Sequence, residues 1–172
     1  MNSSFVEIEP DAISENAFSL IAEDWFLLTA GTTPDNYNTM TASWGGLGQL
    51  WHRRVAFVFV RPQRYTRRFM DNNSLFTMSF FAPDYRNALE YCGSHSGRDV
   101  DKAALTGLTS FEPSTGTTAF EEASLIFVCN KIYHHDFQPE QFLESDIEGL
   151  YPEKGYHRMY VGAIKKVLRK PV

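Results

Sequence analysis

Residues Asn38–Arg68 read NTMTASWGGLGQLWHRRVAFVFVRPQRYTRR, a stretch that passes from small residues through glycines and an apolar run to a cluster of arginines. Small and larger side chains alternate over Thr39–Trp44, which predicts a strand that something flat or bulky approaches closely. The glycines at 45, 46 and 48 then favour a tight turn or a bulge. The dinucleotide fingerprint G-x-G-x-x-G is not completed, because Trp51 stands in place of the third glycine and no helical pattern follows. A Rossmann fold is therefore excluded.

The second part of the stretch changes from apolar to basic. Val55–Val60 is β-branched and aromatic without polar alternation, which predicts a central or interface strand covered on both faces. Arg61-Pro62 ends this strand, and a helix is expected over about Gln63–Asn72. A buried strand thus leads directly into a cluster of arginines.

Outward from this stretch, short elements follow one another closely. Helices are expected over Ser14–Ala22 with Ser14 as its N-cap, Asp84–Cys92 with Asp84 as its N-cap, Lys102–Leu105 and Pro139–Leu143. Strands are expected over Trp25–Ala30, Ser74–Ala82, Leu108–Phe111, Phe120–Phe137 and Met159–Leu168, with a turn over Thr32–Asn38 and a bulge or barrel corner at Gly162. Within Phe120–Phe137, Ile126 and Val128 alternate with Phe127 and Cys129, which places the two pairs on opposite faces. This spacing does not suit a doubly wound parallel sheet. It predicts a mainly β fold, an antiparallel barrel with peripheral short helices.

Composition limits the function. The chain has 172 residues, 43% of them hydrophobic, which favours one domain over residues 1–172 with a sizeable core. A net charge of −5 argues against a nucleic-acid partner. The sequence shows neither a leader pattern nor an apolar run long enough to span a bilayer, so a cytoplasmic protein without membrane contact is expected. Cys92 and Cys129 are expected to be reduced and buried.

Two kinds of catalytic site are not supported. His134, His135 and Asp136 are adjacent, but successive strand residues point to opposite faces, so only His134 and Asp136 could share a site. Two ligands do not make a zinc centre, and no metal is expected. Hydrolase chemistry is also disfavoured, because the sequence has no G-x-S-x-G elbow and neither cysteine lies in an activating context.

Phosphate binding is better supported. Arg61 can make a bidentate contact to a phosphate, and Thr66 with the free amides of the expected helix near Gln63 can add donors. Arg64, Arg67 and Arg68 make this region strongly positive. The sequence therefore predicts a local anion site in an otherwise acidic chain.

Four segments resemble the flavin reductase-like family, which has the FMN-binding split-barrel fold. They are NTMTASW, VFVRPQRYT, CGSHSGRDVDK and YHRMYVGAI, and in this order they cover nearly the whole chain. The resemblance implies an antiparallel split barrel that binds FMN. It also implies a homodimer and NADH or NADPH as co-substrate, with electrons passed to free flavin, a partner oxygenase or another acceptor.

The resemblance also implies roles for individual residues. The flavin ring and ribityl chain would lie along Met40, Thr41, Ala42, Ser43 and Trp44, although Met40 and Trp44 could equally be core residues. The phosphate would be held by Arg61, Tyr65 and Thr66. A loop near the flavin, contributed by the same chain or across a dimer interface, would supply Ser94, Ser96, Gly97, Arg98 and Lys102.

His157 matches a histidine that in this family lies near the flavin face used by the nicotinamide, which makes it the catalytic candidate. Tyr156 precedes it where many relatives have an acidic residue, and His52-Arg53-Arg54 stands where relatives often have prolines. Hydride transfer to a flavin requires position and electrostatics rather than a side-chain acid or base. Two alternatives remain open: a flavin- or haem-binding carrier or sensor on the same barrel, and a structural barrel whose Val55–Val60 strand serves dimerisation.

Overall fold

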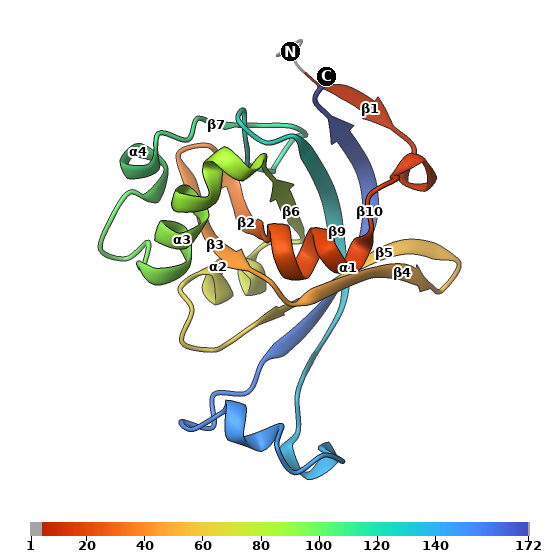
Figure 1. Cartoon of the computed structure of the whole chain (residues 1–172), viewed down its shortest axis with the longest axis vertical. Helices are drawn as coiled ribbons and strands as arrows, with labels where there is room; N and C mark the ends of the chain where they lie inside the picture. Colours follow the sequence, from red (N-terminus) through yellow and green to blue (C-terminus); the bar gives the residue numbers. More distant parts are fainter. Residues whose placement is uncertain (1–4, 172) are drawn as a thin grey trace.

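The computed structural model describes residues 5–171, and these form one curled antiparallel sheet, a separate two-stranded sheet of β7 and β8, and short helices around them (Figure 1). The strand order is β3-β2-β6-β9-β10-β5-β4, and β1 pairs with β10. The strands are β1 Val6–Ile8, β2 Phe26–Thr33, β3 Asn36–Ala42, β4 Gly45–Leu50, β5 Arg53–Val60, β6 Leu75–Phe80, β7 Ser110–Phe111, β8 Ala119–Phe120, β9 Leu125–Asp136 and β10 Arg158–Arg169. The two ends of the order, β3 and β4, are joined through Ser43 and Trp44. The predicted antiparallel split barrel is confirmed.

The helices are short and lie outside the sheet (Figure 1). They are α1 Ala17–Ser19, α2 Thr66–Asn72, α3 Arg86–Ser94 and α4 Lys102–Thr106, and short 3-10 or π-helical turns cover Pro10–Ala12, Leu20–Asp24, Pro83–Tyr85, Pro139–Gln141 and Glu148–Leu150. Within residues 5–171, no helix is long and apolar enough to cross a membrane. The expectation that the N-terminus has no leader pattern concerns in part residues 1–4, which lie outside the described part of the chain.

Two apolar cores lie on the two faces of the sheet. Phe127 and Cys129 of β9 belong to the larger core inside the barrel, whereas Ile126 and Val128 belong to a second core beneath α3 and α4. This alternation is the period-2 pattern predicted from the sequence, and it buries both faces of the first five residues of β9, whereas the far end of the strand is exposed. Each cysteine lies in one of the cores as a free thiol, as predicted.

The glycine-rich segment is a strand, and the prediction of a turn there is wrong. Gly45–Gly48 pair with Val58–Val55 of β5. A Cβ at Gly45 would lie 2.8 Å from the backbone carbonyl oxygen of Phe57, so this position requires glycine, whereas a Cβ at Gly46 or Gly48 would make ordinary contact with the Phe57 ring. The turn comes later, at Trp51 and His52, which have φ values of 50° and 56°. Two non-glycine residues carry the left-handed conformation that a tight hairpin requires.

Several boundaries also differ from the prediction. The segment predicted as a turn over Thr32–Asn38 contains only two turn residues, because the strands extend to Thr33 and from Asn36. The first helix is capped by Asn16 rather than Ser14: the Asn16 side chain accepts from the amides of Phe18 and Ser19. Asp84 does not cap α3; it lies in a 3-10 turn, and α3 begins at Arg86. Local side-chain bonds and strand pairing decided these ends.

Two further boundaries affect the site. α2 begins at Thr66 rather than near Gln63, so its seven residues leave no helix start beside Gln63. The irregularity predicted at Gly162 is confirmed, since the pairing of β10 with β9 shifts between Val161 and Gly162, where Ile132 of β9 is the extra residue. A Cβ at Gly162 would lie 2.4 Å from Phe76 Cζ, so this position requires glycine.

Residues 137–157, here called the arm, join β9 to β10 and project from the barrel (Figure 1). The arm begins and ends at the barrel, where the amide of Phe137 donates to the carbonyl of His157 over 2.9 Å. Gly155 lies so close to Gln63 that a Cβ would meet Nε2 at 2.0 Å. The last residues of the arm therefore pack onto the segment between β5 and α2.

Candidate functional site

Two neighbouring cavities lie between β3, the β5–α2 segment and the α3–α4 loop. The strand cavity has a volume of about 420 Å³ and is lined by Met40, Thr41, Ala42, Ser43, Trp44, Phe59, Arg61, Arg64 and His157. The loop cavity has a volume of about 160 Å³ and is lined by Asn38, Met40, Gln63, Arg64, Tyr65, Thr66, Ser94, His95, Ser96, Gly97, Arg98 and Lys102. Met40 and Arg64 line both cavities, so the two form one site.

One wall of the strand cavity is the end of β3 and its exit, residues 40–44, here called the β3 wall. Met40 and Ala42 are 6% and 9% exposed and belong to the barrel core, so both interpretations offered for Met40 hold at once. Thr41 donates to the carbonyl of Leu89, which fixes this wall to α3. Trp44 is 45% exposed and leaves the core, which is the behaviour expected of a residue that contacts a ligand.

The loop cavity is formed by a tight turn after α3. A Cβ at Gly97 would lie 1.8 Å from Asn38 Oδ1, so only glycine brings the loop this close to β3. The Asn38 amide in turn donates to Thr66 Oγ1 over 2.7 Å. The guanidinium of Arg98 lies over the Tyr65 ring, 4.8 Å from its centre. Residues distant in the sequence thereby enclose a small polar space.

Among residues 5–171, the charge that lines the two cavities is entirely positive, because Arg61, Arg64, Arg98 and Lys102 contribute to the lining and no carboxylate does. Burial, with a smaller effect of Arg61, lowers the pKa of Arg64. Burial also lowers the pKa of Lys102 to about 8, although its ammonium donates to the carbonyls of Thr39 and Cys92 over 2.8 Å. Desolvated cations held near one another are stabilised when an anion binds.

His157 closes the strand cavity from the end of the arm. It is 8% exposed, and its ring centre lies 5.1 Å from that of Trp44. The hydroxyl of Tyr151 lies 2.7 Å from His157 Nδ1. Burial, then Arg61 and Arg64, lower the pKa of His157 to about 4, so the imidazole is neutral at pH 7. Neighbouring cations and desolvation thus act in the same direction.

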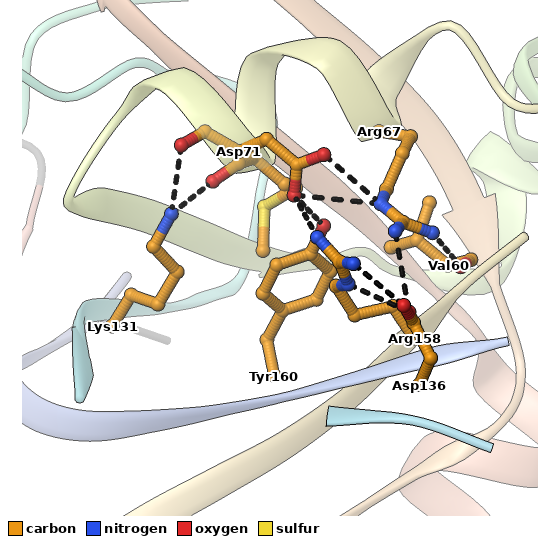
Figure 2. Close-up of polar contacts among 8 residues, drawn as sticks. Val60, Arg67, Asp71, Lys131, Asp136, Arg158 and Tyr160 are labelled. Carbon is orange, nitrogen blue, oxygen red and sulfur yellow. Dashed lines mark hydrogen bonds and ion pairs between the residues drawn. The ribbon is translucent and has the colours of Figure 1, made fainter. Parts of the chain in front are cut away.

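A polar network joins α2 to the ends of β9 and β10 (Figure 2). Arg158 binds Asp136 with an N–O distance of 2.6 Å and Asp71 with one of 3.2 Å, and Arg67 contacts both carboxylates. Burial opposes ionisation of Asp71, but the Tyr160 hydroxyl and the two arginines lower its pKa. The network joins α2 to β9 and β10 and fixes the backbone from which His157 extends.

The arginines at the end of the Asn38–Arg68 stretch occupy different positions in the structure. Arg61 lies in the strand cavity, where it donates to the Leu150 carbonyl over 3.0 Å, rather than beside Thr66. Arg64 lies in both cavities, whereas Arg67 belongs to the polar network and Arg68 lines a separate cavity. The helix-dipole contribution expected near Gln63 is not supported, since α2 starts at Thr66. Arg64, which was not among the predicted FMN-binding residues, is thus the arginine that lines both cavities.

The sequence prediction missed other residues of the site. Phe59 and His95 line the cavities, and Tyr151 contacts the lining residue His157. Phe59 alternates outward on β5, a signal that was available from the strand pattern. Nothing local marks Tyr151, which lies in an irregular loop.

His134, Asp136 and the remaining acids do not assemble a metal site. Asp136 is bound to two arginines, and His134 packs against the Tyr160 ring. Within residues 5–171, no group of three or more His, Cys, Asp or Glu side chains is placed to hold a metal ion. His52-Arg53-Arg54 lies at the β4–β5 hairpin, and none of the three lines the strand or loop cavity.

A larger cavity of about 740 Å³ adjoins the loop cavity on its outer side. Its lining includes Asp35, Asp99 and Asp101, which oppose the binding of an anion. The size of this cavity is therefore less informative than the charge of the two smaller ones.

Solved structures share this fold at low sequence identity. An FMN-binding domain of a flavin reductases-like enzyme from Shewanella baltica matches with TM-score 0.69 and 15% identity, over 96% of this chain and 77% of that one. Flavoredoxin from Methanosarcina acetivorans matches with TM-score 0.64 and 20% identity, over 94% and 73%. The NADH:FAD oxidoreductase from Streptomyces globisporus matches with TM-score 0.65 and 13% identity, over 87% and 76%.

Curated proteins show no match to the sequence. The family described as "Flavin reductase like domain" matches residues 18–170, which is nearly the whole chain and includes every residue of the two cavities. The chain belongs to the flavin reductase like domain family.

Proposed function

We propose that this chain binds FMN across the two cavities and, as a homodimer, oxidises NADH or NADPH and passes the electrons to free flavin or a partner protein. The observation that carries the proposal is the charge of the site. Four cations and no carboxylate line two joined cavities in a chain of net charge −5. Such a site suits a ligand with a strongly anionic end.

The loop cavity fits the phosphate of FMN. Arg64 and Arg98 offer charge-assisted donors, and Thr66 and Ser96 offer hydroxyl groups in the same small space. Lys102 sits behind them as a buried cation held by two carbonyls. The absence of carboxylates from this lining means that nothing there opposes a dianion.

The strand cavity fits the ring system. Small side chains at Thr41, Ala42 and Ser43 leave room along the β3 wall, and Trp44 and Phe59 add aromatic surfaces. FMN supplies the ring that accepts the hydride, and the protein supplies position and electrostatics. Arg61 and His157 line the same cavity, where they can orient a second molecule.

The proposal is tested by adding FMN to the purified chain and following the quenching of flavin fluorescence. Saturable binding is expected, followed by loss of the flavin absorption band when NADH or NADPH is added without oxygen. A folded chain that does not bind FMN contradicts the proposal. Bound FMN that neither nucleotide reduces favours the carrier or sensor alternative. Light scattering on the same sample gives the mass, and a monomer contradicts the dimeric part.

A further inference from the structure

Tyr151 is buried although it belongs to the projecting arm. It is 4% exposed, and its ring packs among Phe142, Tyr156 and His157 with ring centres 5.1 to 6.0 Å away. Arg61 lies over the same ring, 5.1 Å from its centre, and also donates to the adjacent carbonyl of Leu150. Contacts on several sides therefore hold this tyrosine in one position.

The Tyr151 hydroxyl lies 2.7 Å from His157 Nδ1, which is hydrogen-bond distance. Burial raises the pKa of Tyr151, so the hydroxyl keeps its proton. The imidazole is neutral, and one of its nitrogens is then a donor and the other an acceptor. The Tyr151 hydroxyl can donate its proton in a hydrogen bond to His157 Nδ1, and Nδ1 is then the acceptor. This arrangement leaves the ring proton on Nε2.

The Nε2 atom of His157 remains accessible. It has no hydrogen bond to any residue in the described part of the chain, where Nδ1 is the ring nitrogen with a partner. Within residues 5–171, the fully buried side-chain polar atoms without a partner belong to Ser79, Thr118 and Arg169, so Nε2 is not among them. Because His157 lines the strand cavity, an accessible Nε2–H can reach a ligand there.

We propose that Tyr151 is a positioning residue that fixes His157 in the Nε2–H tautomer, so that the strand cavity presents a neutral hydrogen-bond donor to its ligand. A donor of this kind recognises a carbonyl oxygen, such as the carboxamide of a nicotinamide or the carbonyl of another acceptor. His157 does not offer a basic nitrogen to the ligand, because its acceptor atom Nδ1 is hydrogen-bonded to the Tyr151 hydroxyl. The identity of the ligand rests on the proposed function, whereas the tautomer does not.

The tautomer is measured by NMR correlation of the imidazole nitrogens with the ring carbon-bound protons at neutral pH, in the chain without added ligand. His157→Gln assigns the signals, since it removes one of five histidines. We expect wild-type His157 to be protonated at Nε2 alone. In Tyr151→Phe, which keeps the ring and its packing, we expect a mixture of tautomers.

Tyr156→Phe is the matched control, because the Tyr156 hydroxyl donates to Glu148 rather than to the histidine. It should leave the His157 signals unchanged. A wild-type Nδ1–H tautomer, or a Tyr151→Phe spectrum identical to wild type, overturns the proposal. Both results are independent of whether the chain oxidises a nucleotide.

If the proposed function holds, Tyr151→Phe should raise the KM for the nicotinamide nucleotide about threefold to tenfold, the effect of weakening one hydrogen bond. FMN affinity should stay within about twofold of wild type, because Tyr151 lines neither cavity. If FMN affinity falls by the same factor by which the nucleotide KM rises, Tyr151 has a general structural role, and the positioning role is overturned.

Discussion

The strand cavity has two walls of different construction. The β3 wall is part of the barrel: β3 pairs with β2, and its side chains at Met40 and Ala42 belong to the apolar core. The arm reaches the cavity from outside the barrel, where a few specific contacts of Tyr151 and Arg61 hold it. Changes in the β3 wall should therefore cost stability, whereas changes in the arm should alter the site with little loss of stability.

The largest effect is expected at the β3 wall. Met40→Ala removes a core side chain that is 6% exposed and should lower the free energy of unfolding by about 2–5 kcal/mol. Leu143→Ala in the arm is the control: its side chain is 95% exposed, and we expect a change within about 0.5 kcal/mol. Urea unfolding measures both. Similar losses in the two variants would show that the walls do not differ as described.

The next effect concerns the cation shared by both cavities. Arg64→Ala should weaken FMN binding about tenfold to hundredfold, because a charge-assisted contact to the phosphate is lost. Arg68→Ala removes a neighbouring exposed arginine that lines neither cavity and should change affinity less than about twofold. Fluorescence titration gives both constants. Equal weakening would mean that the region acts through its overall charge rather than through Arg64.

A smaller effect is expected from the histidine at the end of the arm. The pKa of His157 is about 4 in the folded chain, whereas an exposed histidine titrates near ~6.5. The unfolded chain thus takes up the proton first, so the contribution of His157 is fully present above about pH 6.5 and is lost as the pH falls toward 4. The loss is about 2–3 kcal/mol over this window.

His157→Gln should remove this part of the pH dependence. Urea unfolding at several pH values, compared between wild type and variant, isolates the contribution of this one side chain. The two curves should converge as the pH falls from about 6.5 to about 4. Parallel curves would show that His157 titrates alike in the folded and unfolded chains, and that the cations around it do not act as described.

Sequence reasoning worked where the physical signal is local. The alternation of β9 identified its two faces, and Gly162 marked the bulge that the pairing confirms. It failed where a distant side chain decided the outcome. Gly45–Gly48 looked like a turn because glycine permits one, but these residues form a strand, and at Gly45 the backbone of Phe57 across the hairpin leaves no room for a side chain. The residues after Pro62 resembled a helix start, yet α2 begins only at Thr66.

The sequence by itself determined the antiparallel barrel, the family and most of the residues of the two cavities, because strand period, turn chemistry and motif order are properties of neighbouring residues. Tertiary structure alone decided that Arg64 rather than Arg61 lies in both cavities, and that Tyr151 bonds His157. The arm brings Tyr151 onto the barrel some ninety residues after Arg61. Which side chains meet there depends on burial and charge summed over segments that no local pattern connects.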